Sequence, residues 1–363
     1  MNTIPGYQIP FTGLKRQYNN LREEILDITD EVLSTGQVMS GPWTMQFEDW
    51  LANKNHQKYA VVCHSGTQAL EIIAAFHKQY GFKVNPPTVL VPAMTYIATA
   101  NAWAKAGWNV HIVDTDNYGL MNPKSVDRGI SFQAVCTVGL YGAAYNRWFP
   151  NESNYAMVED GAQHWLSNNC RRHGHACAIS FDPTKNFANY GNGGAIVTSD
   201  RELEDFARDW TTNGKCGGVA DFVSNSRMSE VDCAQMMVKA KYLNGWQQRR
   251  KDIVRNWIDR LKDTPIRCLI DDSNFEQHCY HKFVIEVNDR DTLKRKLEAD
   301  GITTKIHYDR PLHEEPRYIN TPGPNMLSAA SSLARRCLSL PIYPELTDSE
   351  VEYIATTVLD CVS

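Results

Sequence analysis

The stretch Ser180–Gly194 reads Ser-Phe-Asp-Pro-Thr-Lys-Asn-Phe-Ala-Asn-Tyr-Gly-Asn-Gly-Gly, and its one lysine is Lys185. An apolar run that predicts a β-strand, Ala176–Phe181, precedes this lysine, and a second one, Ala195–Thr198, follows it. A lysine in this place has two interpretations. It is either held in position for chemistry, or it is an ordinary surface lysine on a hairpin, which is the more common situation.

Proline and glycine residues constrain the backbone on both sides of this lysine. Pro183 disfavours a helical conformation of Asp182, so the first strand has to end before the lysine. Three glycines then allow a sharp turn and a close approach to another group: Gly191, Gly193 and Gly194. The rest of the chain has to decide between the two interpretations.

The composition indicates a soluble globular protein with a large and a smaller domain. The chain has 363 residues, of which 42% are hydrophobic and 22% charged. A net charge of -5 gives no reason to expect nucleic acid or an anionic membrane as a partner. The sequence holds no run as long as a membrane span, and Met1–Pro10 lacks a basic region followed by an apolar one, so we expect a cytoplasmic protein.

The ten cysteines form no CxxC pair and are expected to be reduced thiols. Four potential metal ligands, Cys170, His173, His175 and Cys177, fall within eight residues. A zinc site there would be cramped, because one residue separates the two histidines and Gly174 is typical of a hairpin tip. We therefore expect a β-hairpin and no bound metal.

Short apolar runs that alternate with helical segments predict a mainly parallel sheet covered on both faces. The expected strands are Tyr59–Cys63, Thr88–Val91, Val110–Val113, Ala134–Val138, Tyr155–Glu159, Ala176–Phe181 and Ala195–Thr198. In such sheets ligands bind beyond the carboxyl ends of the strands. Asp160 and Lys185 each follow one of these strands, so both lie where chemistry is expected.

The turn Ser65-Gly66-Thr67 lies between the strand Tyr59–Cys63 and a helical stretch, Gln68–Tyr80. Unpaired N–H groups at a helix start favour a phosphate, although ordinary helix capping is the more common role of such a turn.

The chain changes character after a long predicted helix, which predicts a large domain over residues 1–245 and a small α+β domain over 246–363. A long helix is expected over Glu230–Leu261, with a break near Asn244-Gly245. Strands are expected at Tyr280–Val287 and Thr303–His307, and helices at Thr292–Ala299 and after the capping box Thr347–Glu350. The loop Tyr318–Met326 is expected to be the mobile connection.

A phosphate-binding helix start, an acid after one strand and a lysine after another fit an enzyme that uses pyridoxal 5'-phosphate (PLP). In such enzymes a lysine binds the cofactor covalently and an acid keeps the pyridine nitrogen protonated, so that the ring can accept electrons.

The sequence resembles the DegT/StrS family of sugar aminotransferases, which are fold-type I PLP-dependent enzymes, over nearly its whole length. The matching segments are Ile9–Tyr18 (IPFTGLKRQY), Ser40–Pro42 (SGP), Ser65–Leu70 (SGTQAL), Val91–Asn101 (VPAMTYIATAN), Glu159–Gln163 (EDGAQ), Ser180–Gly194, Asn225–Glu230 (NSRMSE), Ile306–His313 (IHYDRPLH) and Leu338–Pro344 (LSLPIYP). No single segment is sufficient, but the set in this order is a strong signal.

The resemblance implies roles around the cofactor ring for four residues. Lys185 is similar to the lysine that forms the Schiff base, and Asp160 to the partner of the pyridine nitrogen. Gln163 is similar to the residue that contacts the ring hydroxyl, and Tyr96 to the aromatic that stacks on the ring. Core packing for Tyr96 and helix capping for Asp160 are the alternatives.

Five further residues resemble phosphate or substrate ligands. Gly66, Thr67 and Ser180 are similar to phosphate ligands of one subunit, and Asn225 to a phosphate ligand from the second subunit. The resemblance therefore implies a homodimer with shared active sites. His307 lies in the motif that lines the substrate side, with a purely structural histidine as the alternative.

Three positions depart from the family pattern. Gly139, in VGLYG, stands where members often carry a histidine or asparagine, so any substrate contact from that side chain is absent. Gly161 replaces a common alanine, and the hairpin Asn168–His175 is unusual in sequence. These departures concern the choice of substrate more than the type of reaction.

The resemblance implies transfer of an amino group from L-glutamate to a nucleotide-linked keto-sugar. The opening IPFTGLKRQY slightly favours a 3-keto over a 4-keto acceptor, and the presence of Lys185 disfavours the relatives that carry a histidine there and act as dehydratases. Two rival hypotheses remain, namely amination of a keto-cyclitol on the same fold, and a catalytically idle regulatory or structural protein.

Overall fold

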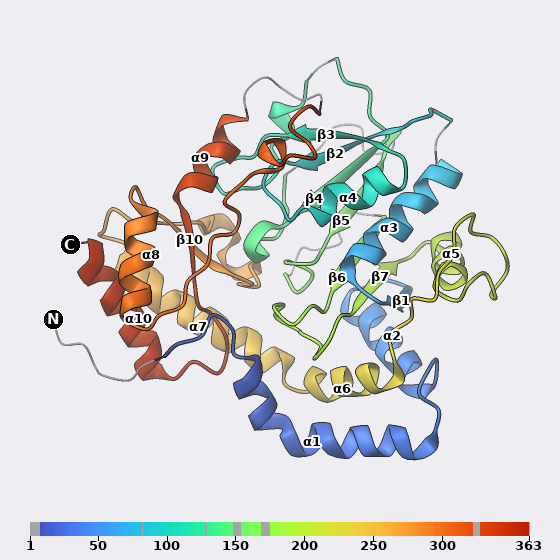
Figure 1. Cartoon of the computed structure of the whole chain (residues 1–363), viewed down its shortest axis with the longest axis horizontal. Helices are drawn as coiled ribbons and strands as arrows, with labels where there is room; N and C mark the ends of the chain where they lie inside the picture. The colour runs from blue at the N-terminus through green and yellow to red at the C-terminus, as the bar shows by residue number, and fades with distance from the viewer. Residues whose placement is uncertain are drawn as a thin grey trace.

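The structure is a computed structural model, and it describes residues 8–81, 83–127, 129–147, 154–167, 175–321 and 327–362. In this part of the chain the larger sheet has seven strands in the order β1-β7-β6-β5-β4-β2-β3 (Figure 1). Their bounds are β1 Tyr59–Cys63, β2 Thr88–Pro92, β3 Asn109–Val113, β4 Ala134–Val138, β5 Ala156–Asp160, β6 Ala176–Ser180 and β7 Gly194–Thr198. β7 is antiparallel to β1 and β6, and the other neighbouring pairs are parallel. The predicted α/β fold with a mainly parallel sheet is confirmed.

Both faces of this sheet are covered by helices, because its strands are apolar on both sides. Ile196 of β7 packs with α3 (Gly66–Phe76), α4 (Ala98–Lys105) and α5 (Arg201–Thr211) in one core cluster. Its neighbours Ala195 and Val197 pack with α2 (Pro42–Lys54) and α6 (Glu230–Ala240) in another. This alternation is expected for a strand whose successive side chains point to opposite faces.

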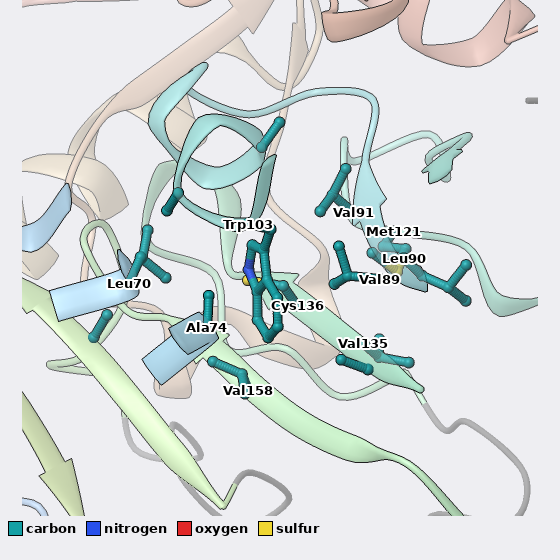
Figure 2. Packing of buried hydrophobic residues seen from close by; sticks show 14 of the residues in the cluster. Leu70, Ala74, Val89, Leu90, Val91, Trp103, Met121, Val135, Cys136 and Val158 are labelled. Atoms are coloured by element: carbon teal, nitrogen blue, oxygen red, sulfur yellow. The ribbon is translucent and has the colours of Figure 1, made fainter. Parts of the chain in front are cut away.

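Trp103 of α4 lies at the centre of the first of these clusters. Figure 2 shows its indole among side chains of α3, β2, β4 and β5, including Leu70, Val89 and Cys136. Trp103 is fully buried and meets Trp108 edge to face, with the ring centroids 4.8 Å apart. An aromatic side chain of this size fixes α4 against the sheet, which sets the position of the segment before it, where Tyr96 lies.

Two helices of the N-terminal region, α2 and the preceding α1, pack against α6. α1 (Leu14–Thr35) buries Leu21, Ile25, Ile28 and Val32 along one face, packed against α6. It ends at Gly36, whose φ of 69° is left-handed, a conformation that glycine adopts readily at a helix end.

The smaller sheet has the order β10-β9-β8 and is antiparallel throughout. Its strands are β8 Arg267–Cys268, β9 Phe283–Glu286 and β10 Cys337–Leu340, and the helices of the same region are α7 Leu243–Leu261, α8 Arg290–Ala299, α9 Ser328–Arg336 and α10 Asp348–Val362. Most of these strands and helices enclose a hydrophobic core of their own, in which Ile9 is fully buried. The backbone amide of Ile9 donates to the carbonyl of Gly301 over 2.8 Å. The proposed boundary at residue 245 falls inside the first turn of α7.

One strand prediction in this region is wrong, and two helix predictions are confirmed. Thr303–His307 is not a strand, because only Lys305 pairs with Ser339 at the edge of β10, and the hydroxyl of Tyr141 then donates to the carbonyl of His307. The predicted break in the long helix is confirmed and lies just before Asn244, between α6 and α7, where the amide of Tyr242 bonds the carbonyl of Lys239. The predicted helical stretch Gln68–Tyr80 is confirmed, with an α-helix from Gly66 to Phe76 that continues as a π-helical turn, His77–Gly81.

Two other predictions fall largely outside the described residues. These are the hairpin Asn168–His175, of which only His175 is described, and the last five residues of the loop Tyr318–Met326.

Candidate active site

Lys185 lies in the connection between β6 and β7, where Ser180 pairs with Gly194 across the two strands. Its backbone amide donates to the carbonyl of Asp182 over 2.9 Å, and its side chain is partly buried. Burial lowers the pKa of the Lys185 amine, and the nearby charges of Asp160 and Asp182 oppose this effect. The lysine is thus on a hairpin, but its amine is directed inward, toward two acids.

Asp160 is the last residue of β5, next to β6 in the sheet, and is almost fully buried. Its Oδ2 accepts a 2.7 Å hydrogen bond from the hydroxyl of Thr99, and its Oδ1 accepts a 3.1 Å bond from the amide of Ala162. Thr99 is in turn 2.8 Å from the hydroxyl of Thr95. The carboxylate is therefore fixed in direction at the carboxyl end of the strand, close enough to Lys185 to influence its pKa.

Gln163 connects this strand end to two tyrosines. Its Oε1 accepts a 2.8 Å bond from the amide of Tyr141, and its Nε2 donates to the hydroxyl of Tyr308 over 3.2 Å. The Tyr308 ring lies 6.2 Å from that of Tyr96, which is 57% exposed. Tyr96 is thus not simply core packing, and its ring is free to contact a flat ligand.

The predicted phosphate site is a crowded junction between α3, β6 and β7. The hydroxyl of Ser65 caps α3 by accepting from the amide of Gln68 over 3.2 Å. A Cβ on Gly66 would lie 2.7 Å from the Cβ of Ser180, and a Cβ on Gly194 would lie 2.5 Å from the amide nitrogen of Gly66. Only glycines allow the strands to approach this helix start so closely.

Thr67, in the first turn of α3, is partly buried and lies beside that junction in sequence. The N–H groups of a first helical turn have no partner within the helix, so this turn can take an anion.

The last two predicted residues come from other segments, and the loop of Asn225 contacts the first turn of α3 through a 3.1 Å bond from Gln68 to Ser224. Asn225 is exposed, forms a bridge with Thr212 and accepts a 3.3 Å bond from Arg227. His307 is 2.9 Å from the hydroxyl of Ser339 through its Nδ1. Burial and nearby lysines lower the pKa of His307 to about 3, so its ring is neutral.

Sequence reasoning missed several residues of this site. Thr99, which fixes Asp160, lies inside the quoted segment Val91–Asn101, and Tyr308 follows His307 in a quoted motif, so both had a signal. Arg250 and Lys282 line a cavity beside Lys185, and neither lies in a quoted segment.

These residues suit PLP. A helix start built for close approach suits its phosphate, a fixed buried carboxylate suits a protonated ring nitrogen, and a partly buried lysine with a lowered pKa suits covalent attachment.

Comparison with known proteins agrees with the assignment of a PLP site. A profile of the DegT/DnrJ/EryC1/StrS aminotransferase family matches residues 19–359. The erythromycin biosynthesis sensory transduction protein EryC1 of Saccharopolyspora erythraea is 31% identical, over 96% of this chain and 98% of that protein. The dTDP-3-amino-3,4,6-trideoxy-alpha-D-glucose transaminase of Streptomyces venezuelae is also 31% identical, over 93% of this chain and 92% of that protein. The crystal structure of S. venezuelae DesV in complex with a ketimine intermediate superimposes with a TM-score of 0.91 at 29% identity and covers 99% of both chains.

The chain therefore belongs to the DegT/DnrJ/EryC1/StrS aminotransferase family. It is a PLP-dependent aminotransferase with the fold of type I enzymes, as the sequence predicts. Among the residues described, no helix is both long and apolar enough to span a bilayer.

Proposed function

We propose that this enzyme transfers the amino group of L-glutamate to a nucleotide-linked keto-sugar, with Lys185 as the residue that binds PLP. The observation that carries the proposal is the partly buried Lys185 amine beside the fixed carboxylate of Asp160, at the carboxyl ends of neighbouring strands. When bound, PLP serves as the electron sink that makes the α-hydrogen of an amino acid acidic.

The two residues have distinct tasks in this proposal. Burial lowers the pKa of Lys185 and so raises the neutral fraction of the amine, and only the neutral amine can attack a carbonyl or accept a proton. Asp160 holds a negative charge where the ring nitrogen is expected, and its bonds from Thr99 and Ala162 keep that charge from rotating away. Lys185 then moves the proton between donor carbon and cofactor carbon.

The remaining predicted ligands complete the site. Gly66, Thr67 and Ser180 are proposed to bind the phosphate, Gln163 the ring hydroxyl, and Tyr96 one face of the ring.

The acceptor is proposed to be a 3-keto sugar. The name of the S. venezuelae relative places the new amine on carbon 3 of a dTDP-linked sugar, which supports this choice over a 4-keto acceptor. The name of EryC1 refers to sensory transduction and would fit a regulatory protein. The intact Lys185–Asp160 arrangement favours catalysis over that rival.

A homodimer with shared sites is part of the proposal. The exposed Asn225 lies on a loop that also exposes the apolar side chains of Phe222 (72%) and Val223 (43%). Apolar side chains grouped on an exposed loop are typical of a protein contact surface. We propose that this loop contacts a second copy of the chain and that Asn225 binds the phosphate in the active site of its partner. Sedimentation of the PLP-loaded enzyme should then give the mass of a dimer.

The test is spectroscopic. Purified protein is expected to take up PLP with the yellow colour of a lysine-bound cofactor, and to lose that colour when L-glutamate is added. Lys185→Ala is expected to abolish the colour, whereas Lys124→Ala, at an exposed lysine, leaves it unchanged. A wild-type protein that stays colourless with PLP would refute the proposal, and a coloured protein that no amino donor bleaches would favour the idle rival. Parallel assays with 3-keto and 4-keto nucleotide sugars then decide the acceptor.

A further inference from the structure

A small cavity beside Lys185 has an unusual lining. Its volume is about 30 Å³, and the chain segments around it come from the N-terminal region, the Lys185 loop and the C-terminal region. Besides Lys185 its charged or titratable lining consists of Arg250, His281, Lys282 and Glu345. Three basic side chains, Lys185, Arg250 and Lys282, thus share this lining with one carboxylate, that of Glu345.

Lys282, directly before β9, is the least compensated of these basic groups. Its side chain is 7% exposed, and its ammonium lies 4.9 Å from the centre of the Phe11 ring. Within the described ranges no carboxylate forms an ion pair with it. Burial lowers the pKa of Lys282 strongly, and the charges of Lys185 and Arg250 add to that effect.

Arg250 of α7 is 6% exposed and, within the described part of the chain, its side chain donates to two backbone oxygens. One guanidinium nitrogen donates to the carbonyls of Tyr280 at 3.2 Å and Ile342 at 2.9 Å. Its Nε has no hydrogen-bond partner among the residues that the structure describes. Burial lowers its pKa to about 10.

Among the described residues neither nearby acid forms an ion pair with Lys282 or Arg250, although the charge of Glu345 acts on Arg250 and that of Asp182 on Lys282. Glu345 lines the cavity, but its closest bond is a 3.4 Å contact from the Nε2 of Gln17, and burial raises its pKa. Asp182 faces Lys282 electrostatically, but its carboxylate accepts bonds from the amide and hydroxyl of Thr184. Burial favours the uncharged form of a base, and a bound anion beside it would favour the charged form and offset the cost of burying that charge.

We propose that this cavity is a carboxylate subsite of the active site, in which Lys282 and Arg250 bind a substrate carboxylate while Lys185 acts on the reacting carbon. The inference rests on the proposed transamination. A water molecule needs about 10–15 Å³ by this measure, so the cavity has room for about two oxygen-sized atoms, which suits a carboxylate and not a phosphate ester.

Two substrates could supply that carboxylate. In a ping-pong reaction donor and acceptor use the same site in turn, so the group is a carboxylate of L-glutamate or of an acidic sugar. Both sources share the chemistry that the cavity recognises, and separate half-reactions distinguish them.

The test uses the PLP-loaded enzyme and glutarate, a dicarboxylate that has no amine and does not react. Lys282→Met is expected to weaken glutarate binding and to raise the KM for L-glutamate by about tenfold or more, as expected for loss of a hydrogen bond to a charged group. The kcat should change far less, because the lost contact is not with the reacting atoms. Lys305→Met is the matched control, because Lys305 lies 5.3 Å from the same Phe11 ring but is exposed and does not line the cavity.

The half-reactions assign the source. A loss confined to L-glutamate assigns the site to the donor, and a loss confined to a uronate-type nucleotide sugar assigns it to the acceptor. Three outcomes would each overturn the inference. Lys282→Met could lose as much activity with a neutral keto-sugar, or it could bind glutarate as tightly as the wild type does. The wild type could also bind inorganic phosphate more tightly than glutarate. If the wild type reacts with no donor, the proposed function fails, but glutarate binding still reports on Lys282 separately.

Discussion

The contact between β7 and the start of α3 can be tested with a single added methyl group, Gly194→Ala. Its Cβ would lie 2.3 Å from the carbonyl carbon of Ser65 and 2.5 Å from the amide nitrogen of Gly66. Ordinary contacts begin at 3.4 Å, so one backbone has to move by about 1 Å. Both contacted atoms belong to the backbone, and no rotation of a side chain can relieve the clash.

The expected cost has two parts. Overpacking of this kind lowers the free energy of unfolding by about 1–3 kcal/mol. The same shift displaces the N–H groups at the start of α3, where we propose that the PLP phosphate binds. Loss of one hydrogen bond to a charged group is worth about 1.5–3 kcal/mol, so the Kd for PLP should rise by about tenfold to a hundredfold.

Absorbance titration of the cofactor-free protein with PLP and denaturation in urea measure the two parts separately. Gly191→Ala is the control in the same loop, because the nearest atom to its Cβ would be 3.9 Å away and its φ is not left-handed. The reasoning is refuted if Gly194→Ala keeps the PLP affinity and stability of the wild type, or if Gly191→Ala is equally damaging.

Two further predictions concern buried charges. Burial lowers the pKa of Lys239 to about 7, so between about pH 7 and pH 10 the unfolded chain binds a proton that the folded one does not. The free energy of unfolding should therefore rise with pH in this window, by up to about 1.4 kcal/mol per pH unit. Lys239→Met should flatten this dependence of stability on pH. If urea denaturation gives the same pH dependence for the variant and the wild type, the prediction is wrong. Glu230 accepts hydrogen bonds from the amides of Gly41 (2.8 Å) and Thr44 (3.2 Å) at the start of α2. Glu230→Gln would place an NH2 donor against these N–H donors, so it should lower the free energy of unfolding by about 2–3 kcal/mol in the same assay. Stability close to that of the wild type would argue against a capping role for this carboxylate.

The strands of the large sheet could be predicted to within about a residue because local sequence determines them. Each is an apolar run buried on both faces, and the signal for such a run needs no knowledge of its neighbours. The capping box before α10 was equally local, and it is confirmed by reciprocal bonds between Thr347 and Glu350 of 2.9 and 3.2 Å.

Thr303–His307 shows where such reasoning stops. Its residues have strand character, but pairing depends on whether a partner edge continues beside them, and only Lys305 finds one. A sheet edge is a property of the tertiary structure, so a local pattern could not have excluded this strand.

The carboxylate cavity is the clearest case of a site without a sequence signal. Phe11, Arg250 and Lys282 come from three distant segments, and the spacing between them carries no information. Lys282 alone resembles any lysine beside a strand. Only its burial, with no ion pair to it among the described residues, points to a site. Long-range assembly of single residues therefore limits prediction of the substrate, whereas the cofactor motifs are contiguous and could be predicted.

The end of β4 shows how a side chain that the family pattern marks as absent can be replaced from elsewhere. Gly139 stands at the position that carries a histidine or asparagine in many relatives, which suggested a lost contact. A Cβ at Gly139 would lie 2.3 Å from the Cγ of His164, whose ring is fully buried and whose Nδ1 accepts a 3.0 Å bond from the Gly139 amide. An imidazole thus occupies this space, but it arrives from the segment after β5, and its Nε2 lies 3.6 Å from the carboxylate of Glu159. The glycine is required by two neighbours, because the same Cβ would also lie 2.0 Å from the carbonyl oxygen of Ala143. A smaller residue at position 164 alone would therefore not make room for a side chain at position 139.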